Sequence, residues 1–220
     1  MYIIMGGLAG ILLGSVWMLA WRNIPQKWFC EYGQAERCAP LHKENRRLLG
    51  VFVILVFFMF GIALSCTGEG EVLSFLLKSS LVWILLQAAV GDFYFQIVAD
   101  QWIVALLLLS AVKIISEGKI GELGTLFLSA ILIAVLLWST SLFLSVLFRQ
   151  EVLGFGDIKL FFSLCLYFGF DSTLWILMCA MVLCGIGCAL LLLLKVYQKE
   201  STCPLVPYIA LASGLLLIGV

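Results

Sequence analysis

The chain has 220 residues, of which 64% are hydrophobic and only 12% charged, and its mean hydropathy is +1.16. A soluble domain is about half apolar and about a quarter charged, so this composition excludes an ordinary soluble protein and predicts an integral membrane protein. Thirteen basic residues balance thirteen acidic ones, so the net charge gives no sign of a nucleic-acid partner, and none is expected.

Apolar segments of roughly membrane-spanning length account for nearly the whole chain. They predict an all-α, polytopic membrane protein with about eight transmembrane helices, at residues 2–21, 48–66, 72–98, 102–116, 123–148, 158–170, 172–194 and 203–220. The expected organisation is a first transmembrane helix (1–21), a short cytoplasmic loop (22–47) and a membrane-embedded core (48–220). Membrane lipid is therefore one expected partner.

The positive charges give the segments an orientation. No basic residue precedes Arg22, which favours a retained first helix with its N-terminus outside over a cleaved signal peptide. If successive segments cross the membrane in alternate directions from an outside N-terminus, all thirteen basic residues except Lys78, Lys113 and Lys119 fall on the cytoplasmic side. This bias agrees with the rule that positive loops stay inside.

The loop 22–47 contains the only histidine, His42, and two cysteines, Cys30 and Cys38. A structural zinc site needs four ligands, commonly in closely spaced pairs, and this loop offers too few. We expect a solvated loop without zinc. In the first helix Gly6, Gly10 and Gly14 recur every four residues, which predicts a packing surface for another helix.

Two aspartates are expected at the same depth of the membrane. Asp92 lies about 21 Å beyond Lys78 at ~1.5 Å of rise per helical residue, toward the cytoplasmic end of segment 72–98. An acid there is costly unless it is paired, hydrogen-bonded or protonated. Asp157 precedes segment 158–170, and two crossings separate it from Asp92. An even number of crossings returns the chain to the same face.

Two carboxyl groups brought together in low-dielectric surroundings cannot both ionise easily, so they keep one proton between them. The ionised member can take a proton from water while the neutral member donates to a peptide carbonyl oxygen. We therefore predict that Asp92 and Asp157 form a catalytic pair. The stretch GFGD supplies Gly154 and Gly156, which can adopt positive φ and would let an extended substrate lie beside Asp157.

Asp100 follows Asp92 by eight residues, about 12 Å along a continuous helix, and is not expected to share its site. It is predicted to be the N-cap of segment 102–116, with its carboxylate accepting the amide of Trp102 or Ile103.

Four stretches resemble the type IV prepilin peptidases, which are membrane aspartic proteases of the GxGD class. They are, in order, GSVWMLAWRNIP at 14–25, GDFYFQIVADQW at 91–102, LGFGDIKLFFSLCLYFG at 153–169 and PLVPYIALASGLLL at 204–217. The third includes the lysine just after the catalytic aspartate, here Lys159. The resemblance implies Asp92 and Asp157 as catalytic residues, with Asp100 and Lys159 in supporting positions.

The resemblance further implies cleavage, after a glycine, of the short basic leader of type IV prepilins or pseudopilins, at the cytoplasmic face of the bacterial inner membrane. Proteolysis would need no cofactor. Many members also methylate the new N-terminus with S-adenosylmethionine and carry two CxxC pairs, which this chain lacks. The proline that usually precedes the second aspartate is Ala99 here. The substrate's apolar helix could pack on the Gly6/Gly10/Gly14 face.

Two alternatives remain open from the residues alone. In one, Asp157 caps a helix and Asp92 is satisfied by a serine or backbone donor, with no catalysis. In the other, the buried acids relay protons in a proton-coupled transporter. Transporters often contain internal repeats of their spans, and the sequence shows no convincing repeat.

Overall fold

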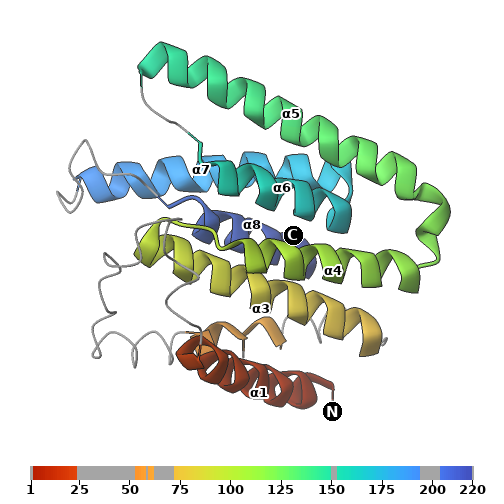
Figure 1. Ribbon diagram of the computed structural model, residues 1–220. Helices are drawn as coiled ribbons and strands as arrows, with labels where there is room; N and C mark the ends of the chain where they lie inside the picture. The colour runs from red at the N-terminus through yellow and green to blue at the C-terminus, as the bar shows by residue number, and fades with distance from the viewer. Residues whose placement is uncertain are drawn as a thin grey trace. The chain divides into compact units, whose positions relative to one another are not determined.

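The computed structural model describes residues 2–23, 53–57, 59–61, 72–149, 153–193 and 204–219, and every regular element in these ranges is helical (Figure 1). The elements are α1 (Tyr2–Asn23), α3 (Val72–Phe95), α4 (Asp100–Ser116), the 3-10 turn η2 (Lys119–Glu122), α5 (Leu123–Phe148), α6 (Phe155–Phe168), α7 (Phe170–Leu193) and α8 (Val206–Ile218). Residues 53–57 and 59–61 are helical as well. The predicted all-α architecture is confirmed.

Within the described residues, three helices are long and apolar enough to cross a membrane, at Val72–Phe95, Lys119–Leu147 and Phe170–Leu190. Shorter apolar helices lie at Gly6–Trp21 and Val206–Ile218. Large apolar side chains remain exposed along them; Phe143 and Val146 on α5, for example, are 70% and 80% exposed. Exposed apolar surface on this scale is what a lipid environment requires. The chain is an integral membrane protein.

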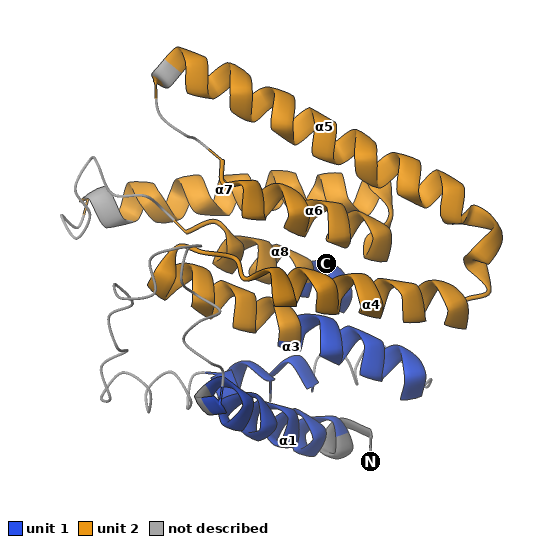
Figure 2. Cartoon of the chain, in the orientation of Figure 1, with its two compact units in different colours: residues 1–83, 214–220 blue, residues 84–213 orange. Residues whose placement is uncertain are grey.

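The chain divides into two compact units, residues 1–83 with 214–220 and residues 84–213 (Figure 2). The predicted loop 22–47, with Cys30, Cys38 and His42, lies outside the described residues except at its very start. The division into 1–21, 22–47 and 48–220 therefore stays a prediction.

In the first unit, the glycine face of α1 is a packing surface, as predicted. A Cβ at Gly14 would lie 2.9 Å from the Cα of Ile54, and a Cβ at Gly61 would collide with the carbonyl oxygen of Gly6. The backbones approach closely because glycine has no side chain. Ile54 and Gly61 of the same chain cover this face, so it is not the open surface that packing of a substrate helix would need.

In the second unit, α6 is the central helix and packs against α4, α5 and α7. Leu160, Phe161 and Leu164 have no exposed surface. The hydroxyl of Ser110 on α4 donates to the carbonyl oxygen of Leu106 at 2.8 Å and reaches the carbonyl of Ser163 on α6 at 3.3 Å. A small polar residue thus fixes the α4–α6 contact within an apolar core.

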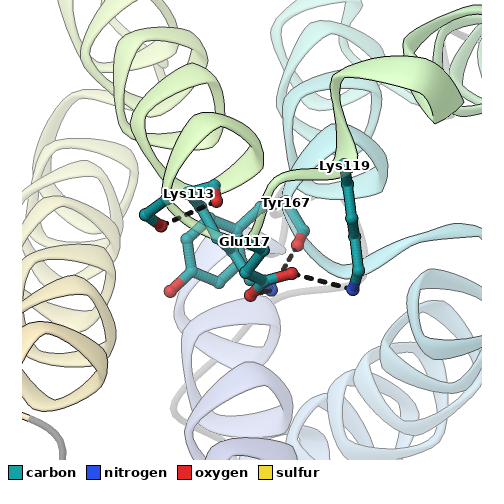
Figure 3. A network of polar contacts seen from close by, with 5 residues as sticks. Lys113, Glu117, Lys119 and Tyr167 are labelled. Atoms are coloured by element: carbon teal, nitrogen blue, oxygen red, sulfur yellow. Dashed lines mark hydrogen bonds and ion pairs between the residues drawn. The ribbon is translucent and has the colours of Figure 1, made fainter.

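The C-terminal ends of α4 and α6 are joined by a polar network (Figure 3). Lys113 Nζ donates to the carbonyl oxygen of Tyr167 at 2.7 Å and lies 4.3 Å from the centroid of its ring. Glu117 accepts from Lys119 at 2.8 Å and lies 3.8 Å from Lys113. A cation beside the last carbonyls of α6 also complements the helix dipole. The two helices run parallel, and this end holds them together.

Candidate active site

Asp92 lies in the last turn of α3 and is only 7% exposed. The helix ends beyond it because Gln96 takes a left-handed conformation, with φ of 54°, and its N–H donates to the carbonyl oxygen of Asp92 at 2.8 Å. Residues 97–99 then lead directly into α4. Asp92 is thereby held at the end of a helix, as its sequence position predicts.

The carboxylate of Asp92 has a backbone partner from a distant part of the chain. Its Oδ2 accepts the N–H of Val206, the first residue of α8, at 3.0 Å, and the Leu205 backbone also contributes. The first amides of a helix have no partner within the helix, so a carboxylate placed there satisfies them and complements the dipole. This is the backbone donor that the non-catalytic alternative requires for Asp92.

Asp157 is the third residue of α6, and the N-cap is Gly154. The Asp157 N–H donates to the Gly154 carbonyl oxygen at 3.1 Å, and the backbone of Gly154 hydrogen-bonds to the Asp157 carboxyl group. Gly154, not Asp157, holds the N-cap position, but the Asp157 carboxyl group accepts a hydrogen bond from the Gly154 backbone, so the capping interaction of the non-catalytic alternative is present. The carboxyl group stands instead in the first helical turn, where negative charge is favoured.

The two glycines of GFGD work differently from the prediction. Gly154 has φ of −69° and ψ of 144°, and Gly156 lies inside α6 without positive φ, so the expected left-handed turn is wrong. What Gly156 provides is space. A Cβ there would lie 3.1 Å from the Cβ of Val98, tighter than normal packing allows. The missing side chain lets the connection between α3 and α4 approach the first turn of α6.

That approach brings Asp92 and Asp157 within electrostatic reach of each other. Burial, and then the negative charge of Asp92, raise the pKa of Asp157 from its usual value near 4 to about 7. Asp157 stands just before the apolar segment that begins at Ile158. No ion pair within the described parts of the chain reaches either carboxyl group. Below about pH 7 the Asp157 carboxyl group therefore keeps its proton.

Asp100 and Lys159 are also brought together. Lys159 Nζ lies 2.7 Å from Asp100 Oδ1 and 5.2 Å from the centroid of the Phe155 ring. The predicted N-cap role of Asp100 is wrong: Ala99 holds that position, with no side-chain cap, and the N–H of Trp102 donates to the Ala99 carbonyl. The Asp100 carboxylate turns to Lys159 instead, because the ammonium group is a stronger partner than a backbone amide.

The described residues contain no group of three or more His, Cys, Asp or Glu side chains that could hold a metal ion. Cys30 and Cys38, the cysteines considered for zinc, lie outside those residues. The expectation of no zinc site in the loop stays a prediction.

Sequence reasoning missed two features of the site. The Val206 amide gives no signal, because a backbone donor leaves no trace in residue identity. The close approach of Val98 to Gly156 could have been predicted, because a glycine in a helix can indicate that a neighbour packs against its backbone. The prediction used the conformational freedom of that glycine rather than the room it leaves for a neighbour.

Comparison with known proteins adds one finding. Residues 79–190, more than half of the chain, match the sequence model of the type IV leader peptidase family. The matched region includes Asp92, Asp100, Asp157 and Lys159. Searches of curated proteins and of solved structures give no match.

Proposed function

The chain belongs to the type IV leader peptidase family, and on that premise we propose that it is an aspartic endopeptidase that uses Asp92 and Asp157 to remove the short, basic leader of type IV prepilins or pseudopilins after a glycine. The observation that supports the proposal is that the charge of Asp92 acts on the carboxyl group of Asp157, which a distant helix contributes. Family membership implies a peptidase. The aspartic mechanism and the cleavage position are the proposal's own.

The roles of the two acids follow from their surroundings. Asp92 accepts the N–H of Val206, and an ionised carboxylate accepts such a bond most strongly, so Asp92 is assigned as the base. Asp157, whose pKa is about 7, is assigned as the proton donor. Water attacks the scissile carbonyl carbon and gives a proton to Asp92, while Asp157 gives its proton to the carbonyl oxygen.

Breakdown of the resulting tetrahedral diol returns the site to its starting state. The proton on Asp92 passes to the leaving nitrogen as the carbon–nitrogen bond breaks, and one hydroxyl of the diol gives its proton back to Asp157. One water is consumed for each bond cleaved, and no cofactor enters the balance.

The proposed setting is the bacterial inner membrane, with the N-terminus outside and cleavage at the cytoplasmic face. The distribution of lysines supports this orientation. Lys113 and Lys119 lie at the C-terminal end of α4 and in η2, while Lys159 lies in the first turns of α6, at the other end of the helix pair, two residues after Asp157. The rule that positively charged loops stay inside then favours a cytoplasmic position for Asp157.

The direct test is to incubate the purified protein with a prepilin and S-adenosylmethionine and to weigh the product. The expected result is a product that lacks the leader and begins just after the glycine. A mass greater by one methyl group would add methylation to the activity, with S-adenosylmethionine as the methyl donor. An intact substrate under conditions where the protein is folded would refute the peptidase proposal and leave the proton-coupled transporter as the better use of two buried acids.

A further inference from the structure

A groove of about 460 Å³ lies between α4, α5 and α6, entirely within the unit formed by residues 84–213. Apart from Lys159, all the residues that line it are aliphatic or aromatic. Three of them, Val135, Trp138 and Phe155, are 55%, 55% and 66% exposed. Apolar surface that stays exposed on an integral membrane protein meets the acyl chains of lipid. The groove is therefore open to the membrane.

The two helices that form the long walls of the groove meet at one end of it and separate toward the other. At the closed end the rings of Phe127 on α5 and Phe162 on α6 pack edge to face, with centroids 5.6 Å apart. Phe162 lines the groove, and Phe127 lies about one turn before Ile131, the first residue that α5 contributes to it. Toward the N-terminal end of α6 the ribbon of α5 diverges from that of α6 (Figure 1). The wide end of the groove is therefore at the first turns of α6.

A cation and an anion stand together at this wide end. Lys159 Nζ lies 5.2 Å from the centroid of the Phe155 ring and 2.7 Å from Asp100 Oδ1. Asp100 lies about one turn before Ile103, the first residue that α4 contributes to the groove. The side chains of Lys159 and Asp100 are 40% and 56% exposed. An ammonium group has three donors and a carboxylate several acceptor sites, so each can bind a further partner without losing the other.

The balance of charge at this end decides which head group fits it. The net charge of the ion pair is zero, so an anionic head group would gain from Lys159 what it loses to Asp100. A head group that carries both a phosphate and a primary ammonium can satisfy both: the phosphate accepts from Lys159, and the ammonium donates to Asp100. A choline head group has no N–H to donate and is the weaker partner.

We propose that the groove binds one phospholipid, with an acyl chain between α5 and α6 and a head group of phosphate and primary ammonium, as in phosphatidylethanolamine, at Lys159 and Asp100. The head group then lies at the N-terminal ends of α4 and α6, the ends proposed above to face the cytoplasm. The site goes beyond the proposed peptidase function and does not depend on it, because neither Asp92 nor Asp157 lines the groove.

The first test uses Trp138, which lines the groove, as a fluorescent reporter. Wild-type protein and Trp138→Phe are reconstituted in phosphatidylcholine vesicles with a fixed fraction of lipid whose acyl chains are brominated and quench tryptophan on contact. The difference between the two proteins gives the emission of Trp138. Brominated phosphatidylethanolamine should quench it about threefold more effectively than brominated phosphatidylcholine or phosphatidylglycerol, the order of preference that exposed charge pairs provide.

Trp175 is the control, because it is 67% exposed on α7 and does not line the groove. Its emission, obtained in the same way from Trp175→Phe, should be quenched equally by the three lipids. Equal quenching of Trp138 by the three lipids would mean that bulk lipid fills the groove without a head-group site, and would overturn the proposal. Strongest quenching by phosphatidylglycerol would overturn it as well.

The second test changes the head-group end and the acyl-chain end separately. Asp100→Asn leaves Lys159 as a lone cation, so the preference of the Trp138 site should move to phosphatidylglycerol, while Glu117→Gln at the other end of α4 should keep it. Ala134→Phe fills the groove and should abolish the preference, while Leu132→Phe, at an exposed position of α5 outside the groove, should not. An unchanged preference in Asp100→Asn or in Ala134→Phe would overturn the site. None of these readouts requires cleavage of a prepilin.

Discussion

The two ends of the parallel pair α4 and α6 hold charged groups in opposite ways. At the C-terminal end the charged side chains bind one another or a backbone carbonyl: Lys113 donates to the Tyr167 carbonyl, and Glu117 pairs with Lys119 (Figure 3). At the N-terminal end the cation Lys159 pairs with Asp100, which is 56% exposed on its side chain, and not with the buried Asp92.

The difference separates ion pairs that stabilise the fold from the pair of carboxyl groups that we propose to be catalytic. At the C-terminal end, paired opposite charges stabilise the contact between α4 and α6, and neither partner is placed to transfer a proton. At the other end, backbone donors hold the carboxyl groups of Asp92 and Asp157. Among the described residues, no cation forms an ion pair with either of these two groups. Such an arrangement favours keeping a proton, which is what acid–base chemistry needs.

The largest expected effect comes from removing either acid of the pair. Asp92→Asn and Asp157→Asn should each lower the rate of prepilin cleavage by about a thousandfold or more, since each removes a proton-transfer group. The side-chain amide oxygen in Asp92→Asn can still accept the Val206 N–H, so the fold should persist. Gel analysis of a co-expressed prepilin measures this. Glu117→Gln, a matched loss of charge at the other end of α4, should cleave normally. Normal cleavage by either Asp variant would contradict a catalytic role for the pair.

A second effect should follow from filling the space at Gly156. Gly156→Val places methyl groups against Val98 and separates the α3–α4 connection from α6, so the cleavage rate should fall about tenfold or more. Gly185→Val is the control, because nothing lies within 4 Å of a Cβ at Gly185 on α7. Adding Val98→Gly should restore part of the lost rate. Failure of that rescue would show that the contact does not position the acids.

The rate should depend on pH through Asp157. A pKa raised to about 7 means that the proton is present below that pH and is lost above it, so the acid form needed for catalysis disappears as the pH rises. The cleavage rate should fall about tenfold per pH unit above neutrality. Lys119→Met should leave this alkaline limb in place, because Lys119 belongs to the other end of the helix pair. A flat profile up to about pH 9 would contradict the assignment.

The smallest effects are expected from replacing Lys159 or Lys113, and they should differ between stability and cleavage rate. Lys159→Met should lower stability by less than about 1 kcal/mol, because its pair with Asp100 is solvent-exposed, and should slow cleavage a few-fold. Lys113→Met should cost about 1.5–3 kcal/mol, since it removes a charged hydrogen bond to the Tyr167 carbonyl, and should leave the rate of the folded protein unchanged. Thermal unfolding in detergent and cleavage kinetics measure the two. A larger loss of stability for Lys159→Met, or a larger loss of rate for Lys113→Met, would contradict the distinction between the two ends of the α4–α6 pair.

Most of the helices could be predicted from the sequence because their apolar segments are long and separated by polar residues. The segment predicted at 123–148 is α5, Leu123–Phe148. α3 ends at Phe95, before the predicted 98, and α8 begins at Val206, after the predicted 203. Two other helices begin earlier than predicted, with polar or flexible residues: α4 at Asp100 and α6 at Phe155, each two or three residues before the apolar segment. Hydropathy gives no weight to a first turn that contains aspartate or glycine.

For the site, counting membrane crossings assigned Asp92 and Asp157 a common depth. It could not assign their partners. The pair formed by Asp100 and Lys159 joins residues 59 positions apart, and Val206 lies 114 positions from Asp92. Contacts of this kind depend on how the helices pack, which local patterns of hydrophobicity do not encode.

The central claim, that Asp92 and Asp157 hold one proton between them, can be measured by infrared difference spectroscopy of the purified protein during a pH titration. We expect a protonated carboxyl band that disappears as the pH rises through about 7 and that is missing from Asp157→Asn but retained in Glu117→Gln. A wild-type spectrum with no such band about one pH unit below that midpoint, or a band that Asp157→Asn leaves unchanged, would contradict the account.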